Sequence, residues 1–289
     1  MRLLAALLLS TVLAAAQTGF TFEEPGPVSI RLLENGRPVY VYNYGKVLPE
    51  GVPEDRARCC YLHPVWAPNG VIVTDDFPKD HLHHRGVFWA WPVVRYRGVR
   101  YDLWLMRGVE RRFSRWLARE ASPRRARLAV ENAWFAGGEQ IVRETVEIVA
   151  YPVRQDSRRL DFHLRFEALR GPVTLSGAPK PGTAYGGFCV RFAPRRETRI
   201  TTETGLLREE NSNLVPSRWA QLEALYEGGR AALRIDIDPA NPGYPNGWCL
   251  RHYGFLGVDF PGYDSYLLKP GEPLELRYRV TVSGGGEDQ

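Results

Sequence analysis

Residues 140–151 read QIVRETVEIVAY, and the two-residue alternation of this stretch decides the fold class. Val142, Val146 and Ile148 share one side of an extended backbone, whereas most residues on the other side are polar. This pattern is typical of a strand with one buried face and one solvated face. The same alternation recurs along the chain in residues 109–117, 126–135 and 159–168.

The segments on either side have the same character. Residues 28–45 read VSIRLLENGRPVYVYNYG, in which Asn35-Gly36 separates two alternating runs and predicts a β-hairpin. Only residues 217–226 and 103–117 could be helical. Further short apolar runs, divided by Gly and Pro, are residues 172–176, 185–192, 231–237, 254–260 and 274–283. About a dozen strands with almost no helix predict an all-β fold, a two-sheet antiparallel β-sandwich. We expect residues 17–289 to form one domain.

Residues 1–16 are apolar after Arg2 and end in three alanines, which predicts a secretory signal peptide. The mature chain would then be secreted or periplasmic and would begin near Gln17. No later apolar run approaches the ~20 residues of a membrane-spanning helix, so we expect no membrane span. The net charge is +5, but the basic residues alternate with acidic ones and form no long basic run. This argues against a nucleic-acid partner. The sequence has no repeat at a fixed period and does not give the oligomeric state.

The four cysteines lack the spacing of a structural zinc site. Cys59 and Cys60 are adjacent and would point to opposite faces of a strand. We therefore expect at most one of them to face Cys189 or Cys249.

Residues 61–91, YLHPVWAPNGVIVTDDFPKDHLHHRGVFWAW, contain four of the six histidines. On an extended backbone His81 and His83 would share one side and His84 would take the other. One imidazole could act as a general acid or base, with Asp76 as a carboxylate partner. Two imidazoles and an aspartate could instead bind a divalent metal, although the spacing matches no specific metal motif and we expect no cofactor. Alternatively, the histidines only hydrogen-bond the loop and hold its shape. The fourth histidine, His63, is a candidate for binding substrate.

Three further candidate residues have two interpretations each. Arg85 could bind a substrate carboxylate or form an internal salt bridge with a preceding aspartate. Trp89 could stack on a sugar ring or belong to the core. Glu144 lies among inward-facing aliphatics, so it either faces a pocket or is a paired structural ion.

Two later segments contribute further candidates. His252 lies in a loop rich in Gly, Pro and Asn, where it could line a pocket rim or stabilise a turn. Tyr185 precedes two glycines that allow close backbone approach, and Arg191 alternates onto the same face as Cys189.

Three strings carry a family resemblance: residues 63–91, the Tyr185 segment with Arg191, and residues 239–260, PANPGYPNGWCLRHYGFLGVDF, followed by LKPGEPLELRYRV. They resemble a bacterial family of exported domains of unknown function, many of whose members carry the label "methane oxygenase PmoA-like". The resemblance implies a family whose genes are often found with genes for carbohydrate-processing enzymes and sugar oxidoreductases. It also implies a supersandwich fold similar to that of galactose-mutarotase-like proteins. The chain has no membrane span after residue 16, so it cannot be the multi-span subunit that this label describes.

In that class of fold a histidine and a carboxylate exchange protons with a sugar in an open groove. Transferred to this chain, the acid would be His81, His83 or His252, and the base would be Asp76 or Glu144. Arg85 or Arg191 would hold a substrate oxyanion, and Trp89 would supply a stacking face. The sequence thus predicts an exported carbohydrate-active enzyme, a hydrolase, lyase or epimerase. The alternatives are a non-catalytic carbohydrate-binding sandwich and a metal-dependent oxygenase or hydrolase.

Overall fold

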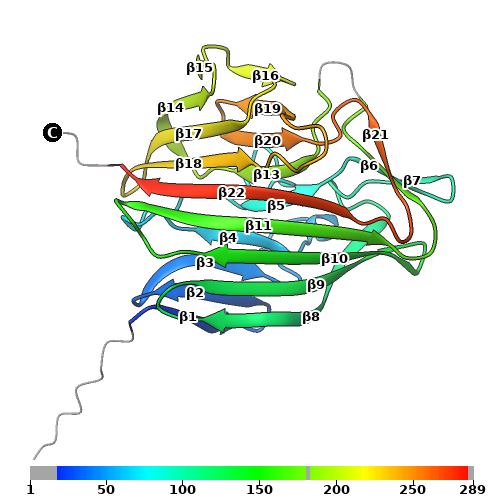
Figure 1. Ribbon diagram of the computed structural model, residues 1–289, viewed down its shortest axis with the longest axis horizontal. Helices are drawn as coiled ribbons and strands as arrows, with labels where there is room; N and C mark the ends of the chain where they lie inside the picture. The colour runs from blue at the N-terminus through cyan, green and yellow to red at the C-terminus, as the bar shows by residue number, and fades with distance from the viewer. Residues whose placement is uncertain (1–17, 180–182, 286–289) are drawn as a thin grey trace, which may run out of the picture.

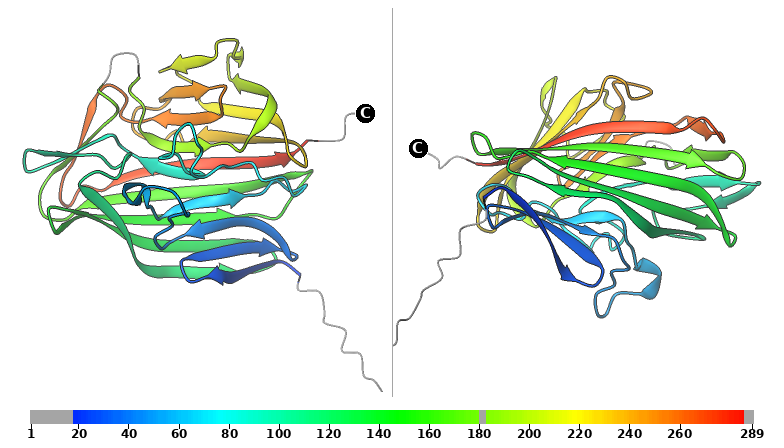
Figure 2. Two further views of the ribbon diagram at one scale, coloured as in Figure 1. Left: turned by 180° about the vertical axis from the view of Figure 1, so that it is seen from behind. Right: turned by 60° about the horizontal axis from the view of Figure 1, so that its bottom comes forward.

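The computed structural model describes residues 18–179 and 183–285. Within them the chain is all-β, as predicted, and two nine-stranded antiparallel sheets lie face to face (Figures 1 and 2). A smaller four-stranded antiparallel sheet, which the sequence did not predict, completes the fold. The predicted signal peptide, residues 1–16, lies outside the described residues. No helix in the described part of the chain is long and apolar enough to cross a membrane.

The first sheet contains the N-terminal hairpins and the strands that carry the candidate site. Its strands, in spatial order, are β1 (Phe20–Gly26), β2 (Ser29–Glu34), β3 (Arg37–Asn43), β4 (Tyr61–Val65), β5 (Val87–Ala90), β13 (Gly187–Arg191), β20 (Phe255–Asp259), β19 (Gly247–Arg251) and β16 (Asn211–Asn213). The predicted hairpin is present: Glu34 pairs with Arg37, and the turn residues Asn35 and Gly36 both have positive φ.

The second sheet forms the layer nearest the viewer in Figure 1. Its strands, in spatial order, are β15 (Gly205–Leu206), β14 (Arg195–Thr202), β17 (Trp219–Tyr226), β18 (Gly229–Ile237), β22 (Leu274–Gly284), β11 (Ser157–Ala168), β10 (Glu139–Ala150), β9 (Ala126–Ala136) and β8 (Val109–Ala121). The small sheet consists of β21 (Ser265–Leu268), β12 (Val173–Ser176), β6 (Val93–Tyr96) and β7 (Val99–Tyr101).

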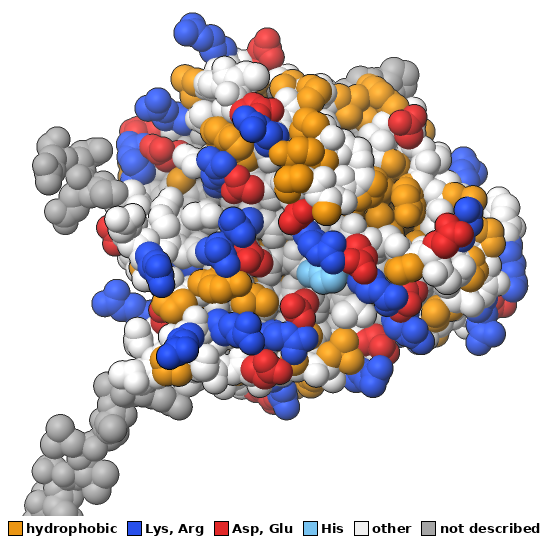
Figure 3. Space-filling model, viewed as in Figure 1, with side chains coloured by type: hydrophobic (Ala, Val, Ile, Leu, Met, Phe, Trp, Pro, Cys, Tyr) orange, Lys and Arg blue, Asp and Glu red, His pale blue; other side chains and the backbone are white. Residues whose placement is uncertain are grey.

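The alternation of the second sheet puts its apolar side chains into the core and its charges into solvent. In β11 every second residue is buried, from Arg158 to Ala168. On the solvated face, oppositely charged side chains pair across neighbouring strands, as Arg127 of β9 does with Glu147 of β10 at 2.6 Å. Figure 3 accordingly shows blue and red side chains interspersed over this face. This face therefore carries the predicted mixture of positive and negative charges.

Three strands in the middle of the first sheet, β5, β13 and β20, are buried on both faces. One face packs into the core, where Phe188 stacks on Tyr278 of the second sheet at 4.4 Å between ring centroids. The other face is therefore also covered. Its cover includes the loop of residues 74–85, which pairs with the end of β13 through the bridge between Thr74 and Phe192. This covered outer face carries the candidate site.

Two local predictions are wrong. Neither segment that could be helical is a helix: residues 219–226 form strand β17, and residues 103–117 form a turn followed by β8, which confirms the alternation of residues 109–117. The described residues contain no α-helix, only one 3₁₀ turn at Glu54–Arg56. Cys59 and Cys60 do not point to opposite faces, because Cys60 has a φ of 61° and the two sulfurs lie 3.1 Å apart. None of the four cysteines, all of which are described, forms a disulfide.

Candidate functional site

The loop of residues 78–84 is folded into two consecutive turns. The N–H of His81 donates to the carbonyl of Pro78 at 3.0 Å, and the N–H of His84 donates to the carbonyl of His81 at 2.8 Å. The expectation of an extended loop, with His84 opposite the other two histidines, is therefore wrong. The turn brings residues three apart face to face, and the rings of His81 and His84 stack with centroids 4.6 Å apart and planes 6° apart.

All three imidazoles belong to one aromatic cluster. His83 lies edge-on to His84 at 4.6 Å, while the free face of His81 stacks on Tyr253 at 5.1 Å. His84 in turn lies against Phe255, at 4.9 Å between centroids. Tyr253, His81, His84 and Phe255 thus form a continuous stack that ties the loop to the β19–β20 hairpin. Such packing fixes the orientation of each ring.

Asp80 and Arg191 anchor the ring of His81. The Nδ1 atom of His81 lies 2.9 Å from Oδ2 of Asp80, and Nη2 of Arg191 donates to both oxygens of Asp80 at 2.7 and 3.0 Å. Burial acts to raise the pKa of Asp80, but the bonds and charges of His81 and Arg191 outweigh it and lower the pKa. An ionised Asp80 assigns the proton of a neutral His81 to Nδ1, which leaves Nε2 as an acceptor. Nε2 has no hydrogen-bond partner in the described chain.

The cluster lines a cavity of about 280 Å³. We call it the histidine cavity. Its walls are mainly aromatic, and its lining includes His81, His83, His84, Trp104, Tyr185 and Tyr253. The floor comes from the outer face of β19 and β20, through Cys249, Arg251 and Phe255. The guanidinium of Arg251 is held by the carbonyl of Ser212 at 2.7 Å and by Oδ1 of Asn213 at 2.5 Å. The cavity therefore combines apolar ring faces with a few fixed polar groups.

Two of the imidazoles are held in the neutral form. Burial, followed by the charge of the neighbouring His81, lowers the pKa of His83 to about 3. Burial and the charges of the other two histidines lower the pKa of His84 well below its usual range. His84 is 3% exposed and its Nδ1 has no hydrogen-bond partner. Near neutral pH both rings therefore offer hydrogen bonds without charge.

Three other predicted residues lie in or beside this cavity. Tyr185 lines it and packs against Trp104 at 4.8 Å between centroids. Arg191 does not line it but contacts two of its neighbours, through its bonds to Asp80 and through the ring of Tyr253, whose centroid lies 5.1 Å from its guanidinium. His252 lies on the other side of Tyr253, in a separate hollow of about 650 Å³ that Arg191 also lines. Its Nδ1 atom is 3.3 Å from the carbonyl of Glu210.

His63 does not line the histidine cavity. Its Nδ1 atom bonds Oγ1 of Thr74 at 3.1 Å, at the start of the site loop. Burial and the charge of Arg58 lower the pKa of His63 to about 4. His63 is therefore a neutral ring that holds the start of the loop through its bond to Thr74.

The two carboxylates predicted as bases are paired inside the protein. Asp76 forms an ion pair with Arg58 at 3.1 Å and accepts the hydroxyl of Tyr61 at 2.5 Å. Burial, only partly offset by Arg58, raises the pKa of Asp76 to about 6. Glu144 is fully buried between the sheets, where Arg111 lies 3.3 Å away. Of the two interpretations of Glu144, the structure has the paired ion.

Two predicted substrate contacts are also buried. Arg85 is 1% exposed and lies over the ring of Phe88 at 4.9 Å, so it cannot reach a ligand, and Asp76 pairs with Arg58 instead. Trp89 is fully buried on the core face of β5, stacked on Phe188. Neither can serve the role proposed for it, because the alternation of β5 directs Trp89 into the core and Phe88 towards the cavity.

A model of a protein family matches residues 29–289. The chain belongs to this family. It is described as a family of unknown function (DUF6807), a description that assigns no activity and does not include the methane-oxygenase label. No curated protein matches the chain in sequence.

Several solved structures are similar to this DUF6807 chain. A galactose mutarotase related enzyme from Lactobacillus acidophilus is 6% identical, with a TM-score of 0.41 over 93% of this chain and 98% of that chain. A GalM/aldose epimerase homologue from C. elegans is 8% identical, with a TM-score of 0.37 over 93% and 100%. A heparinase III is 12% identical, with a TM-score of 0.38 over 94% of this chain and 35% of that chain. Similarity at these identities and TM-scores assigns no role to any residue of this chain.

Several site residues of this DUF6807 chain were not predicted. Trp104 and Arg251 line the cavity, and the fold brings them together from segments about 150 residues apart. Asp259, at the end of β20, is 3% exposed, and burial raises its pKa well above the usual range despite the charge of Arg251. The strand alternation would place Arg251 with Cys249, but only the strand order shows that their face is covered. In the described chain no three His, Cys, Asp or Glu side chains are arranged to hold a metal ion.

Proposed function

We propose that this chain is a carbohydrate-active protein that binds a sugar ring in the histidine cavity and exchanges a proton with it through His81. The observation that carries the proposal is the fixed imidazole. His81 is stacked between Tyr253 and His84, is anchored at Nδ1 by Asp80, and lines the cavity, and its Nε2 has no hydrogen-bond partner in the described chain.

The lining of the cavity matches the chemistry of a sugar. One face of a pyranose is made of C–H groups and packs on aromatic rings, while its hydroxyls need polar partners. Trp104 and Tyr185 supply aromatic walls, and His83, His84 and Arg251 supply polar groups. The volume of about 280 Å³ lies just below the ~300–1,000 Å³ typical of ligand sites, so a single sugar unit fits better than an oligomer.

The geometry supports general acid–base chemistry at Nε2. A proton leaving a hydroxyl or an acidic C–H group of the sugar would pass to Nε2 and give an imidazolium. The carboxylate of Asp80 stabilises that charge, and Arg191 keeps Asp80 in place. The same imidazolium can return the proton to an oxygen on the same side of the sugar, such as a leaving oxygen or the ring oxygen. Hydrolysis, elimination and epimerisation all use this step.

A second candidate is a sugar-binding protein without catalysis. It is favoured by the pairing of Asp76 with Arg58 and of Glu144 with Arg111, because this removes both expected carboxylate bases from the cavity. The aromatic walls alone suffice for binding.

The variant His81→Asn separates the two candidates. Its amide nitrogen retains a donor for Asp80 in place of Nδ1 but has no equivalent of Nε2. With neutral and oxidised monosaccharides and short glycosides, an enzyme should lose about 10²–10⁴-fold in kcat while binding by calorimetry changes only a few-fold. His163→Asn, on the outer face of the second sheet, is the matched control.

Undiminished turnover in His81→Asn would refute the catalytic role. Binding without turnover in the wild-type chain would select the binding protein, and the absence of both would refute the carbohydrate proposal. We also propose export of the chain, which predicts that protein recovered outside the cytoplasm begins near Gln17.

A further inference from the structure

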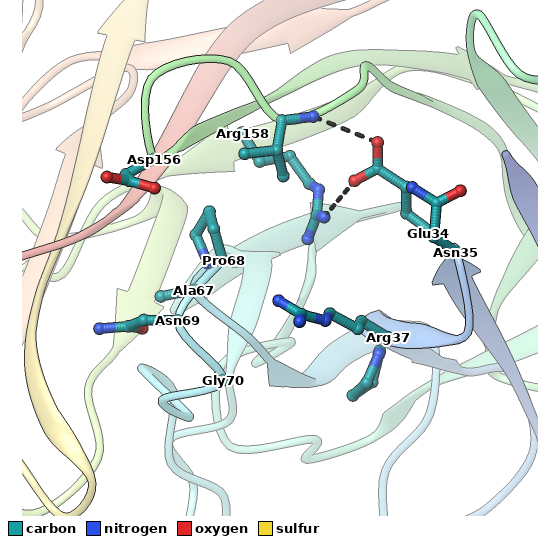
Figure 4. A pocket seen from close by; sticks show the side chains of 11 residues that line it. Glu34, Asn35, Arg37, Ala67, Pro68, Asn69, Gly70, Asp156 and Arg158 are labelled. Carbon is teal, nitrogen blue, oxygen red and sulfur yellow. Dashed lines mark hydrogen bonds and ion pairs between the residues drawn. The ribbon is translucent and has the colours of Figure 1, made fainter. Parts of the chain in front are cut away.

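A second hollow, of about 750 Å³, lies where the β2–β3 hairpin meets the turn between β10 and β11 (Figure 4). It shares no lining residue with the histidine cavity. The residues that give it its chemistry are Glu34, Arg37, Pro68, Asn69, Asp156 and Arg158. The hollow thus joins an end of the first sheet to an end of the second.

Arg158 is the buried cation of this hollow. The residue is 3% exposed, and its Nη2 donates to Oε2 of Glu34 at 2.5 Å. Its Nε and Nη1 atoms are buried and have no hydrogen-bond partner. Glu34 cannot serve them as well, because its Oε1 accepts the N–H of Val153 at 3.2 Å. A guanidinium has five N–H donors, so Arg158 has donors left for a ligand that supplies oxygen acceptors.

Arg37 adds a second guanidinium. It is exposed at the first position of β3, and Figure 4 shows its side chain directed into the same hollow as that of Arg158. It forms no ion pair within the described chain. Glu34 already balances the charge of Arg158, so Arg37 is the surplus cation on this side of the hollow. Asp156 lies on the other side.

We propose that this hollow binds a small organic oxyanion, through a carboxylate or sulfate group held between Arg37 and Arg158. Planar guanidinium groups match the paired oxygens of such anions. An organic molecule fits better than a free inorganic ion because the volume is that of a ligand site and because Pro38, Ala67 and Pro68 provide apolar wall. This site is independent of the function proposed for the histidine cavity.

Calorimetry on the full chain tests the proposal with three probes: D-glucuronate, D-glucose and sulfate. Glucuronate should bind at one more site per chain than glucose, because glucose lacks the carboxylate and can bind only in the histidine cavity. Arg37→Ala should weaken glucuronate binding about tenfold or more, since a charged hydrogen bond and a charge are lost. Arg100→Ala removes an exposed arginine from β7 and should leave binding unchanged. Circular dichroism should show Arg37→Ala folded, because the side chain is exposed.

The variant His81→Ala distinguishes the two sites. A site specific for glucuronate over glucose that survives His81→Ala and is lost in Arg37→Ala supports this proposal, whether or not the histidine cavity binds sugars. A site specific for glucuronate over glucose that survives Arg37→Ala overturns it, as does the absence of such a site. Sulfate binding as tight as glucuronate binding would reveal an adventitious ion only and would also overturn it.

Discussion

Acid should destabilise this chain through histidines that are buried in the neutral form, and His63 allows the effect to be measured singly. Burial, together with the charge of Arg58, lowers the pKa of His63 to about 4, whereas an imidazole in an unfolded chain titrates near 6.5. Between these two values the unfolded state binds more protons than the folded state. The stability contributed by neutral His63 is therefore complete above about pH 6.5 and is lost as the pH falls towards about 4.

The magnitude follows from the width of that window. At about 1.4 kcal/mol per pKa unit, the full loss is about 3 kcal/mol, and about 2 kcal/mol of it falls between about pH 7.5 and pH 5. The variant His63→Asn removes the titration and keeps a nitrogen near Oγ1 of Thr74. Urea unfolding at the two pH values should show that the wild type loses about 2 kcal/mol more than the variant.

The difference between the two proteins cancels the other titrating groups. One of these is Asp76, whose raised pKa acts in the opposite direction because its folded form takes up a proton more readily. His163→Asn, which removes a half-exposed ring from β11, controls for the loss of any imidazole. Equal losses in wild type and His63→Asn would show that His63 is protonated as easily in the folded chain as in the unfolded one, and would refute the reasoning.

Three further outcomes are expected. Glu144→Gln should lower the free energy of unfolding by about 3–5 kcal/mol in urea titrations, because it leaves the buried Arg111 without its counter-ion; a loss below about 1 kcal/mol would contradict this. Tyr253→Ala should weaken ligand binding in the histidine cavity about tenfold by calorimetry while Tyr253→Phe preserves it, since the stacked face and not the hydroxyl packs on the imidazole. Gly86→Ala should abolish soluble expression, because a Cβ there would lie 1.8 Å from the carbonyl oxygen of Leu62; a soluble, stable variant would show that the loop can shift.

Most of the fold could be predicted because apolar and polar residues alternate along each long strand in the sequence itself. Residues 140–151 alternate in the sequence, and β10 alternates in burial in the same phase. The prediction failed at residues 217–226, where alanines and leucines favour a helix locally but pairing with β18 decides for a strand. It also missed the covered outer face of β13 and β20. Runs buried on both faces show no alternation, so their length alone cannot tell which element covers them.

The candidate site could be located but not assembled from the sequence. The density of histidines identified the loop, but its partners come from the β19–β20 hairpin and from Tyr185, a position that only the strand order fixes. Asp76 lies beside the histidines in the sequence and Glu144 lies among inward-facing aliphatics, so the sequence indicates both as candidate bases. Each turned out to have an arginine partner that lies elsewhere in the sequence, Arg58 and Arg111. Ion pairing between distant segments is the step that the sequence does not reveal.

The turn at residues 78–84 explains why the histidines lie together. Pro78 cannot donate to a strand ladder, and its carbonyl instead accepts the N–H of His81, which starts the first turn. The second turn then places His81 and His84, three residues apart, in face-to-face contact that an extended backbone would forbid. The bonds from Arg191 to Asp80 tie this turn to the end of β13. The spacing of the histidines is therefore meaningful only for a turn, and any substitution that straightens the loop should disperse the cluster even if every histidine remains.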